Sequence, residues 1–248
     1  MSREFSSYPK LRDIRKLYCA TPYELSHIPD DVIRNIGRHL IYLLHTGRTD
    51  VSGDDWGDIF AKVLNGTHFA SPVGIADVAV GKSAWSLKTV KSSNVFGTKS
   101  VRLISGRCSP DYSFGISNPH EDIQRTGQAV LAVWNARIDI AYESYNPVRV
   151  NVLIRSDDMT KFRIFEEHIE RYRTTDYEWK ENRNGNLEGY HKVRGTKCFT
   201  WQPHGAQFTI HTDVPDDARK FRIRKPPVAP IDEVLKMLKY DDSWVDLL

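Results

Sequence analysis

This 248-residue chain has few of the residues that would cross-link it or hold it in a membrane. It contains only three cysteines, and no two of them form a CxxC pair: Cys19, Cys108 and Cys198. An odd, scattered set argues against a disulfide framework and against a zinc site, and we expect a reducing, cytoplasmic compartment. No apolar run approaches the roughly 18 residues of a membrane helix, and the N-terminus lacks the apolar region of a secretory signal.

Several common functional motifs are also absent. The chain has no GxGxxG, GxxxxGK[ST], GxSxG or HExxH pattern. The run 81-GKS-83 ends like a phosphate loop, but Ala76 stands where that loop needs glycine, and a strand follows in place of a helix. The net charge of +3 permits a polyanionic partner without indicating one.

Hydrophobic periodicity predicts most of the secondary structure. Helices are expected at 28–47, 53–66, 120–145 and 230–239, with a short helix near 11–17. Two short strands lie within 74–94, and residues 148–156 alternate like a buried strand. Residues 91–119 read as a long loop with one strand at 100–104, and charged strands follow, with a hairpin turn at Asn184-Gly185.

This order predicts an α/β or α+β fold with a mixed central sheet flanked by helices. We expect one domain, 1–248, made of an N-terminal helical segment (1–52), a central core (53–156) and a β-rich C-terminal part (157–248).

Opposite charges interrupt the apolar stretch 74-GIADVAVGKSAWSLKTVKSSN-94. If two antiparallel strands join near Gly81–Ser83, Asp77 and Lys88 meet at one end of the sheet. A carboxylate beside a lysine is suited to Mg²⁺ and phosphate chemistry, because Mg²⁺ takes one or two carboxylates together with waters and phosphate oxygens. The alternative is that neither residue takes part in a reaction: Asp77 ends a strand, and Lys88 is a strand-end lysine whose charged group reaches solvent. This alternative stays open.

Over residues 53–156, the predicted elements are a helix with an acid, a strand with Asp77, a strand with Lys88, a helix and a strand. This order resembles that of the PD-(D/E)XK nuclease superfamily. Two positions depart from the family motif: Ala76 replaces its proline, and Ser86 replaces the acid two residues before the lysine. The resemblance is to the Ser-x-Lys variant found in some restriction endonucleases, in which a later helix supplies the missing carboxylate.

The resemblance implies a role for each matching residue. Asp77 binds Mg²⁺, Lys88 positions the attacking water, and Ser86 stands uncharged beside them. Glu121, at the start of the helix predicted at 120–145, supplies the replacement carboxylate, and Asp58 matches an additional metal-binding acid of many family members.

Two segments are candidates for DNA contact. The first is a basic stretch without carboxylates that follows Lys88, as a phosphate backbone requires, and the second surrounds a turn whose glutamines are suited to base edges. A solvated loop is the alternative for the first. The residues are Lys91, Ser92, Ser93, Asn94, Lys99, Arg102 and Arg107 in the first segment, and Gln202, His204 and Gln207 in the second.

The sequence therefore predicts a Mg²⁺-dependent endonuclease of double-stranded DNA resembling type II restriction enzymes, acting as a homodimer on a palindromic site. Two alternatives remain: a non-catalytic DNA-binding protein that keeps the nuclease-like fold, and an enzyme of unrelated chemistry.

Overall fold

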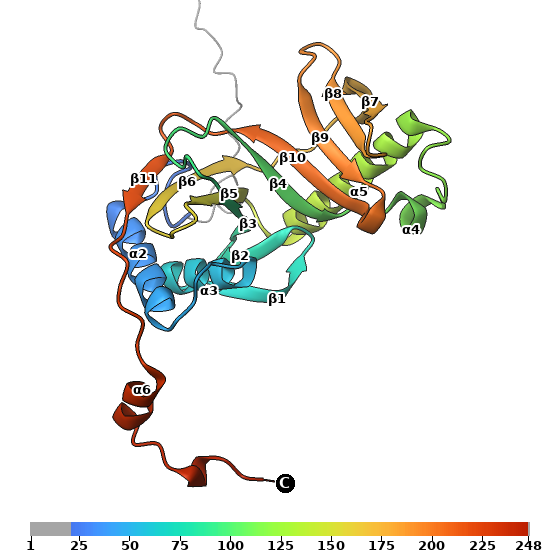
Figure 1. The fold of residues 1–248 in the computed structure, drawn as a ribbon. Coiled ribbons are helices and arrows are strands. Elements are labelled where there is room, and N and C mark those ends of the chain that lie inside the picture. The colour runs from blue at the N-terminus through green and yellow to red at the C-terminus, as the bar shows by residue number, and fades with distance from the viewer. Residues whose placement is uncertain (1–20, 248) are drawn as a thin grey trace, which may run out of the picture.

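The structure, a computed structural model, describes residues 21–247. It contains two β-sheets with helices packed against them (Figure 1), so the α+β class predicted from the sequence is confirmed. The short helix expected near 11–17 lies outside the described residues. Among the described helices, none is long and apolar enough to cross a membrane.

The first sheet is mixed and has the strand order β1-β2-β3-β5-β6-β11. Strand β3 runs parallel to β5, whereas every other neighbouring pair is antiparallel. The parallel step needs a long crossover, and the chain makes it through β4 and a helix before it returns as β5. The strands are β1 (Thr67–Val73), β2 (Ala76–Val80), β3 (Ser83–Lys91), β5 (Val148–Arg155), β6 (Lys161–His168) and β11 (Arg219–Arg222).

The second sheet is antiparallel and has the order β4-β10-β9-β8-β7. Its three hairpins turn at Gly185, Gly195 and Gly205, all in the left-handed backbone region that favours glycine. The strands are β4 (Ser100–Arg107), β7 (Tyr177–Glu181), β8 (Leu187–His191), β9 (Lys197–Gln202) and β10 (Gln207–Asp213).

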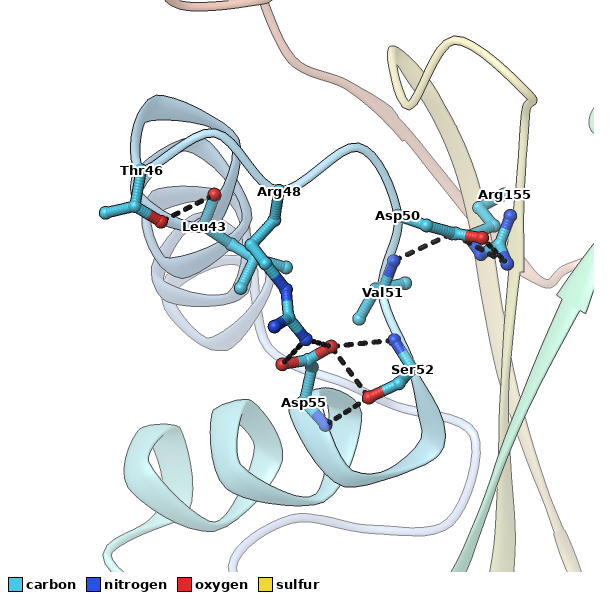
Figure 2. Close-up of polar contacts among 8 residues, drawn as sticks. All are labelled: Leu43, Thr46, Arg48, Asp50, Val51, Ser52, Asp55 and Arg155. Atoms are coloured by element: carbon cyan, nitrogen blue, oxygen red, sulfur yellow. Dashed lines mark hydrogen bonds and ion pairs between the residues drawn. The ribbon is translucent and has the colours of Figure 1, made fainter. Parts of the chain in front are cut away.

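Two helices, α2 (Asp30–His45) and α3 (Gly53–Leu64), cover one face of the first sheet. Trp56 and Phe60 of α3 pack with Trp85 of β3 in a fully buried aromatic cluster. At the start of α3, Ser52 and Asp55 form a reciprocal capping box (Figure 2). This box satisfies backbone N–H groups that have no partner within the helix.

The loop between α2 and α3 is held at two further points (Figure 2). Arg48 donates to both carboxylate oxygens of Asp55, and Arg155 at the end of β5 pairs with Asp50 at 2.7 Å. These contacts fix the two helices to each other and to the sheet.

The opposite face of the first sheet packs against α5 (Ile123–Ser144) and the second sheet. Ala76 and Ala84 of the first sheet share one core cluster with Trp134 of α5 and with Phe199 and Phe208 of the second sheet. Two further helices complete the described structure: α4 (Pro110–Phe114) and α6 (Ile231–Met237), with 3₁₀ turns at Thr174–Asp176, His204–Ala206 and Asp242–Trp244.

The sequence analysis found the main elements and missed two strands. The strand β1 is mostly exposed and carries no alternating apolar pattern, and β11 contains three basic residues in four. In the expected loop 91–119, strand β4 runs on to Arg107 and α4 follows. The expected boundary near residue 156 falls between β5 and β6, which pair within one sheet.

Candidate active site

The β2–β3 hairpin brings Asp77 and Lys88 together, as the sequence predicts. The two strands pair antiparallel with Val78 opposite Trp85, and Gly81 makes the turn with a φ of 58°. Because side chains alternate along a strand, Asp77, Ser86 and Lys88 all lie on the face opposite to α3. The Lys88 Nζ atom is 3.7 Å from Asp77 Oδ2.

Hydrogen bonds from β3 fix the carboxylate of Asp77. The backbone N–H of Leu87 donates to Asp77 Oδ2 at 2.7 Å, and the Ser86 hydroxyl donates to the same oxygen at 3.3 Å. Ser86 is only 2% exposed, so its hydroxyl lies beneath the carboxylate and away from bulk solvent. The side chain of Asp77 is therefore pre-positioned by the strand beside it.

The Lys88 ammonium lies among three oxygen atoms. It donates to Ser86 Oγ at 3.0 Å and to the Leu87 carbonyl at 3.1 Å, with Asp77 Oδ2 as the third. Burial lowers the pKa of Lys88, the Asp77 carboxylate opposes that effect, and the positive charge of Arg137 adds to the lowering. A lysine with a lowered pKa in a cleft is a common feature of catalytic sites.

The sequence analysis did not identify Arg137, which reaches the site from α5. Its guanidinium donates to the Gly74 carbonyl, before β2, and to the Ser105 carbonyl on β4. Arg137 thus joins the helix to both sheets and brings a second positive charge to Lys88. The sequence held one signal for Arg137. It is a single arginine between Trp134 and Ile138, on the apolar side of the helix predicted at 120–145.

Ser86 and Lys88 line a cleft of about 990 Å³ between the two sheets. Leu103 and Ser105 of β4 form part of its second wall, and Glu167 of β6 lies on the same wall as Ser86. The rest of the lining mixes charges and aromatic rings, including His168, Glu170, Tyr172, Tyr177, Arg194, Lys197, His211 and Asp213. The cleft is therefore not uniformly basic.

Glu167 is a cleft carboxyl that the sequence analysis also did not identify. Burial raises its pKa, the Thr212 hydroxyl opposes this through a 3.2 Å hydrogen bond, and the like charges of Glu170 and Asp213 add to the rise. Register places Val150 between Ser86 and Glu167, so the two are separated by two strand spacings, about 10 Å. No group of three or more His, Cys, Asp or Glu side chains within residues 21–247 is placed to hold a metal.

The structure does not bring Glu121 to Asp77. Glu121 is exposed, one residue before the N-cap of α5, where the neighbouring His120 pairs with Glu181 of β7. Arg137, whose positive charge acts on Lys88, lies about 22 Å further along the helix axis. The replacement carboxylate expected at Glu121 is therefore at the wrong end of α5.

Asp58 is also separated from Asp77. It lies on α3, across the sheet from the face that carries Asp77, and pairs with His68 of β1 at 2.9 Å. Its side chain is 61% exposed. The spacing of acids along the sequence does not reveal which face of a sheet a helix covers.

The basic stretch after Lys88 is partly engaged in local contacts. Lys91 pairs with Asp157 at 2.8 Å, the Ser92 hydroxyl bonds with Thr98, and Asn94 closes a turn. Ser92 is half-buried, whereas Ser93 and Lys99 are exposed. Only part of this stretch is free to meet a polyanion.

The second predicted segment and the end of β4 form one surface. Gln207 lies opposite both Arg107 and Gln202, and His204 is exposed in the turn between them. The preceding residue Gly106 lies against the Arg137 guanidinium, so this surface adjoins the site at Lys88. Arg102 is exposed further along β4, opposite His211.

A second buried polar cluster lies on the α3 side of the sheet. Glu166 accepts hydrogen bonds from the side chains of Tyr23, Trp85 and Asn151 and pairs with Arg149 at 3.2 Å. Burial raises the pKa of Glu166 and these partners oppose the rise. The cluster fixes the segment before α2 to the sheet and has a structural role.

Comparisons with protein-family models, curated proteins and solved structures found no match to this chain.

Proposed function

We propose that this chain is a Mg²⁺-dependent endonuclease of double-stranded DNA, similar to type II restriction enzymes of the PD-(D/E)XK superfamily. The observation that carries the proposal is the 3.7 Å contact between Asp77 and Lys88 on paired strands. Support comes from the chain order around it, in which α3, β1, β2 and β3 precede α5 and β5. This order agrees with the one on which the resemblance rests.

The oxygen atoms around Lys88 have the chemistry that Mg²⁺ prefers. Asp77 Oδ2, Ser86 Oγ and the Leu87 carbonyl oxygen lie close together, and all three are hard ligands. Asp77 supplies the negative charge, and Ser86 and Leu87 supply neutral oxygens. When bound, Mg²⁺ polarises a phosphoryl oxygen and lowers the pKa of a coordinated water.

The protein's own side chains then position the reacting groups. Lys88 holds the attacking water by a hydrogen bond, and its lowered pKa suits it to exchange a proton. Its positive charge, with that of Arg137, stabilises the charge that develops on the phosphoryl oxygens. Of the predicted DNA contacts, Arg107, Gln202 and Gln207 lie on the surface that adjoins Arg137 through Gly106.

A second function is favoured by a specific observation. Among the described residues, Asp77 belongs to no group of three or more metal-binding side chains, position 86 is serine, and Glu121 and Asp58 lie elsewhere. Such a site suits a protein that binds DNA without cutting it.

One experiment separates the two functions. Purified protein is incubated with phage DNA and Mg²⁺, with binding and cleavage measured in parallel for wild type, Asp77→Ala, Lys88→Ala and the control Asp58→Ala. The nuclease function predicts fragments from wild type and Asp58→Ala, and none from the other two variants. Binding by all four without fragments supports the second function, and absence of both activities refutes both.

A further inference from the structure

The last residues of the described chain, 230–247, form an arm that leaves the rest of the molecule (Figure 1). The arm consists of α6, a connecting turn and the 3₁₀ turn Asp242–Trp244. Within the described residues, its hydrogen bonds are all internal, and no ion pair joins it to the two sheets or their helices. Within residues 21–247, the arm thus makes no polar contact with the rest of the chain.

Its composition is that of a segment that binds another surface. Ile231, Met237, Leu238 and Trp244 are 49–74% exposed, and Leu247 is 96% exposed. Free chain ends are usually polar, whereas a contiguous exposed apolar segment marks an interaction site. Tyr240 and Trp244 pack edge to face at 5.8 Å, which gives the end of the arm a fixed shape.

The root of the arm is firmly attached beside α2. The Ala229 N–H donates to the His45 carbonyl at 2.8 Å, and His45 Nδ1 lies 2.6 Å from the Pro227 carbonyl oxygen. Val228 lies against Gly47. The arm therefore starts from a defined position at the C-terminal end of α2.

A groove of about 460 Å³ lies next to that root, between α2 and α3. Tyr42, which is 67% exposed, lies one helical turn before His45 and forms part of its wall. The rest of its lining is Arg38, His39 and Leu43 of α2 and Asp55, Asp58, Ile59 and Lys62 of α3. The groove thus combines apolar side chains with charges of both signs.

Charge complements the apolar match. Residues 230–248 contain five acidic and two basic side chains, a net charge of −3, whereas the whole chain carries +3. Within residues 21–247, Arg38 donates only to Asn35, and Lys62 forms no ion pair. The two carboxylates of the groove already have partners, Asp55 with Arg48 and Asp58 with His68. Arg38 and Lys62 are therefore the groove charges available to an acidic arm.

We propose that the arm of each chain docks into the α2–α3 groove of a second copy, so that two copies exchange arms. The arm runs away from its own groove, and its root lies within one turn of that groove. A two-fold axis beside α2 therefore places each arm root near the partner's groove, which is the geometry of a closed, self-complementary dimer. This proposal does not rest on the nuclease function.

The test uses two exposed substitutions in the full-length chain, Leu238→Asp in the arm and Tyr42→Asp in the groove, with Tyr112→Asp as the control. Tyr112 lies on α4 and is 94% exposed, so it offers an exposed apolar site away from the arm and the groove. Sedimentation equilibrium should give a dimer for wild type and control, and a monomer for each of the other two. Circular dichroism should show that all four are folded.

Mixing the two monomeric variants gives the decisive result. The arm of the Tyr42→Asp chain and the groove of the Leu238→Asp chain are both intact, so the mixture should regain a dimer. A monomeric wild type, a dimer that survives either substitution, or a mixture that stays monomeric would each overturn the proposal.

Discussion

Replacing Asp77 by Asn tests whether the carboxylate is the counter-charge of Lys88. Asparagine keeps the shape of the side chain and an oxygen that can accept from the Leu87 N–H. At 3.7 Å, two unit charges near a protein surface interact by about 4 kcal/mol. Both side chains are 20–24% exposed, and solvent screening reduces this to about 2 kcal/mol.

This energy corresponds to a loss of about 30-fold in the proton affinity of Lys88. The sign follows from the environment: burial already lowers the pKa of Lys88, and Asp77 opposes that effect, so its removal lowers the pKa further. The measurement is a pH titration of the Lys88 side chain by NMR, with its Nζ carrying ¹³C-methyl groups.

Asp157→Asn is the matched control, because it removes a carboxylate from Lys91 on the same strand. It should leave the Lys88 titration unchanged. If Lys88 titrates at the same or a higher pH in Asp77→Asn than in wild type, the reasoning is wrong.

Three further predictions concern stability. Glu166→Leu leaves the Arg149 guanidinium buried without its partner, so urea unfolding should show a loss of about 3–5 kcal/mol, and a loss below 1 kcal/mol would contradict this. Because burial raises the pKa of Glu167 above its unfolded value of about 4.3, folding favours the protonated form. Wild type should therefore lose stability relative to Glu167→Gln as the pH rises from below 4.3 through the raised pKa, whereas parallel pH profiles would argue against it. Ser52→Ala removes the hydroxyl that accepts from the Asp55 N–H in the capping box of α3, which should lower the unfolding free energy by about 1 kcal/mol; an unchanged urea midpoint would count against that role.

The central hairpin was predictable because its information is local. A turn at Gly81 and alternation along two short strands are enough to place Asp77 beside Lys88. The helices α2, α3 and α5 were predictable for the same reason, since each carries its own apolar periodicity.

The failures arise where position depends on packing across the chain. Glu121 directly precedes the N-cap of the correct helix, but the sequence does not say which end of α5 approaches the sheet. Asp58 lies on a helix whose covered face is decided by Trp56 and Phe60 packing on Trp85. Contacts with distant segments likewise determine the position of Arg137.

The burial of Glu167 in the cleft could not be predicted from the sequence, for a related reason. Glu166 and Glu167 belong to a stretch predicted only as charged strands, and the two side chains point to opposite faces of β6. One joins a buried cluster with Arg149, and the other meets Thr212 of the second sheet. Only the pairing of the sheets reveals these partners.

The most direct test of the central claim is single-turnover cleavage of a supercoiled plasmid in Mg²⁺, comparing Asp77→Asn with Asp58→Asn. Both variants remove one carboxylate charge and keep the side-chain shape. The account predicts that Asp58→Asn cuts at the wild-type rate, while Asp77→Asn loses at least about 100-fold, the scale on which an electrostatic group at a reaction centre acts. Equal rates for the two variants, or no cleavage by wild type at any Mg²⁺ concentration, would contradict it.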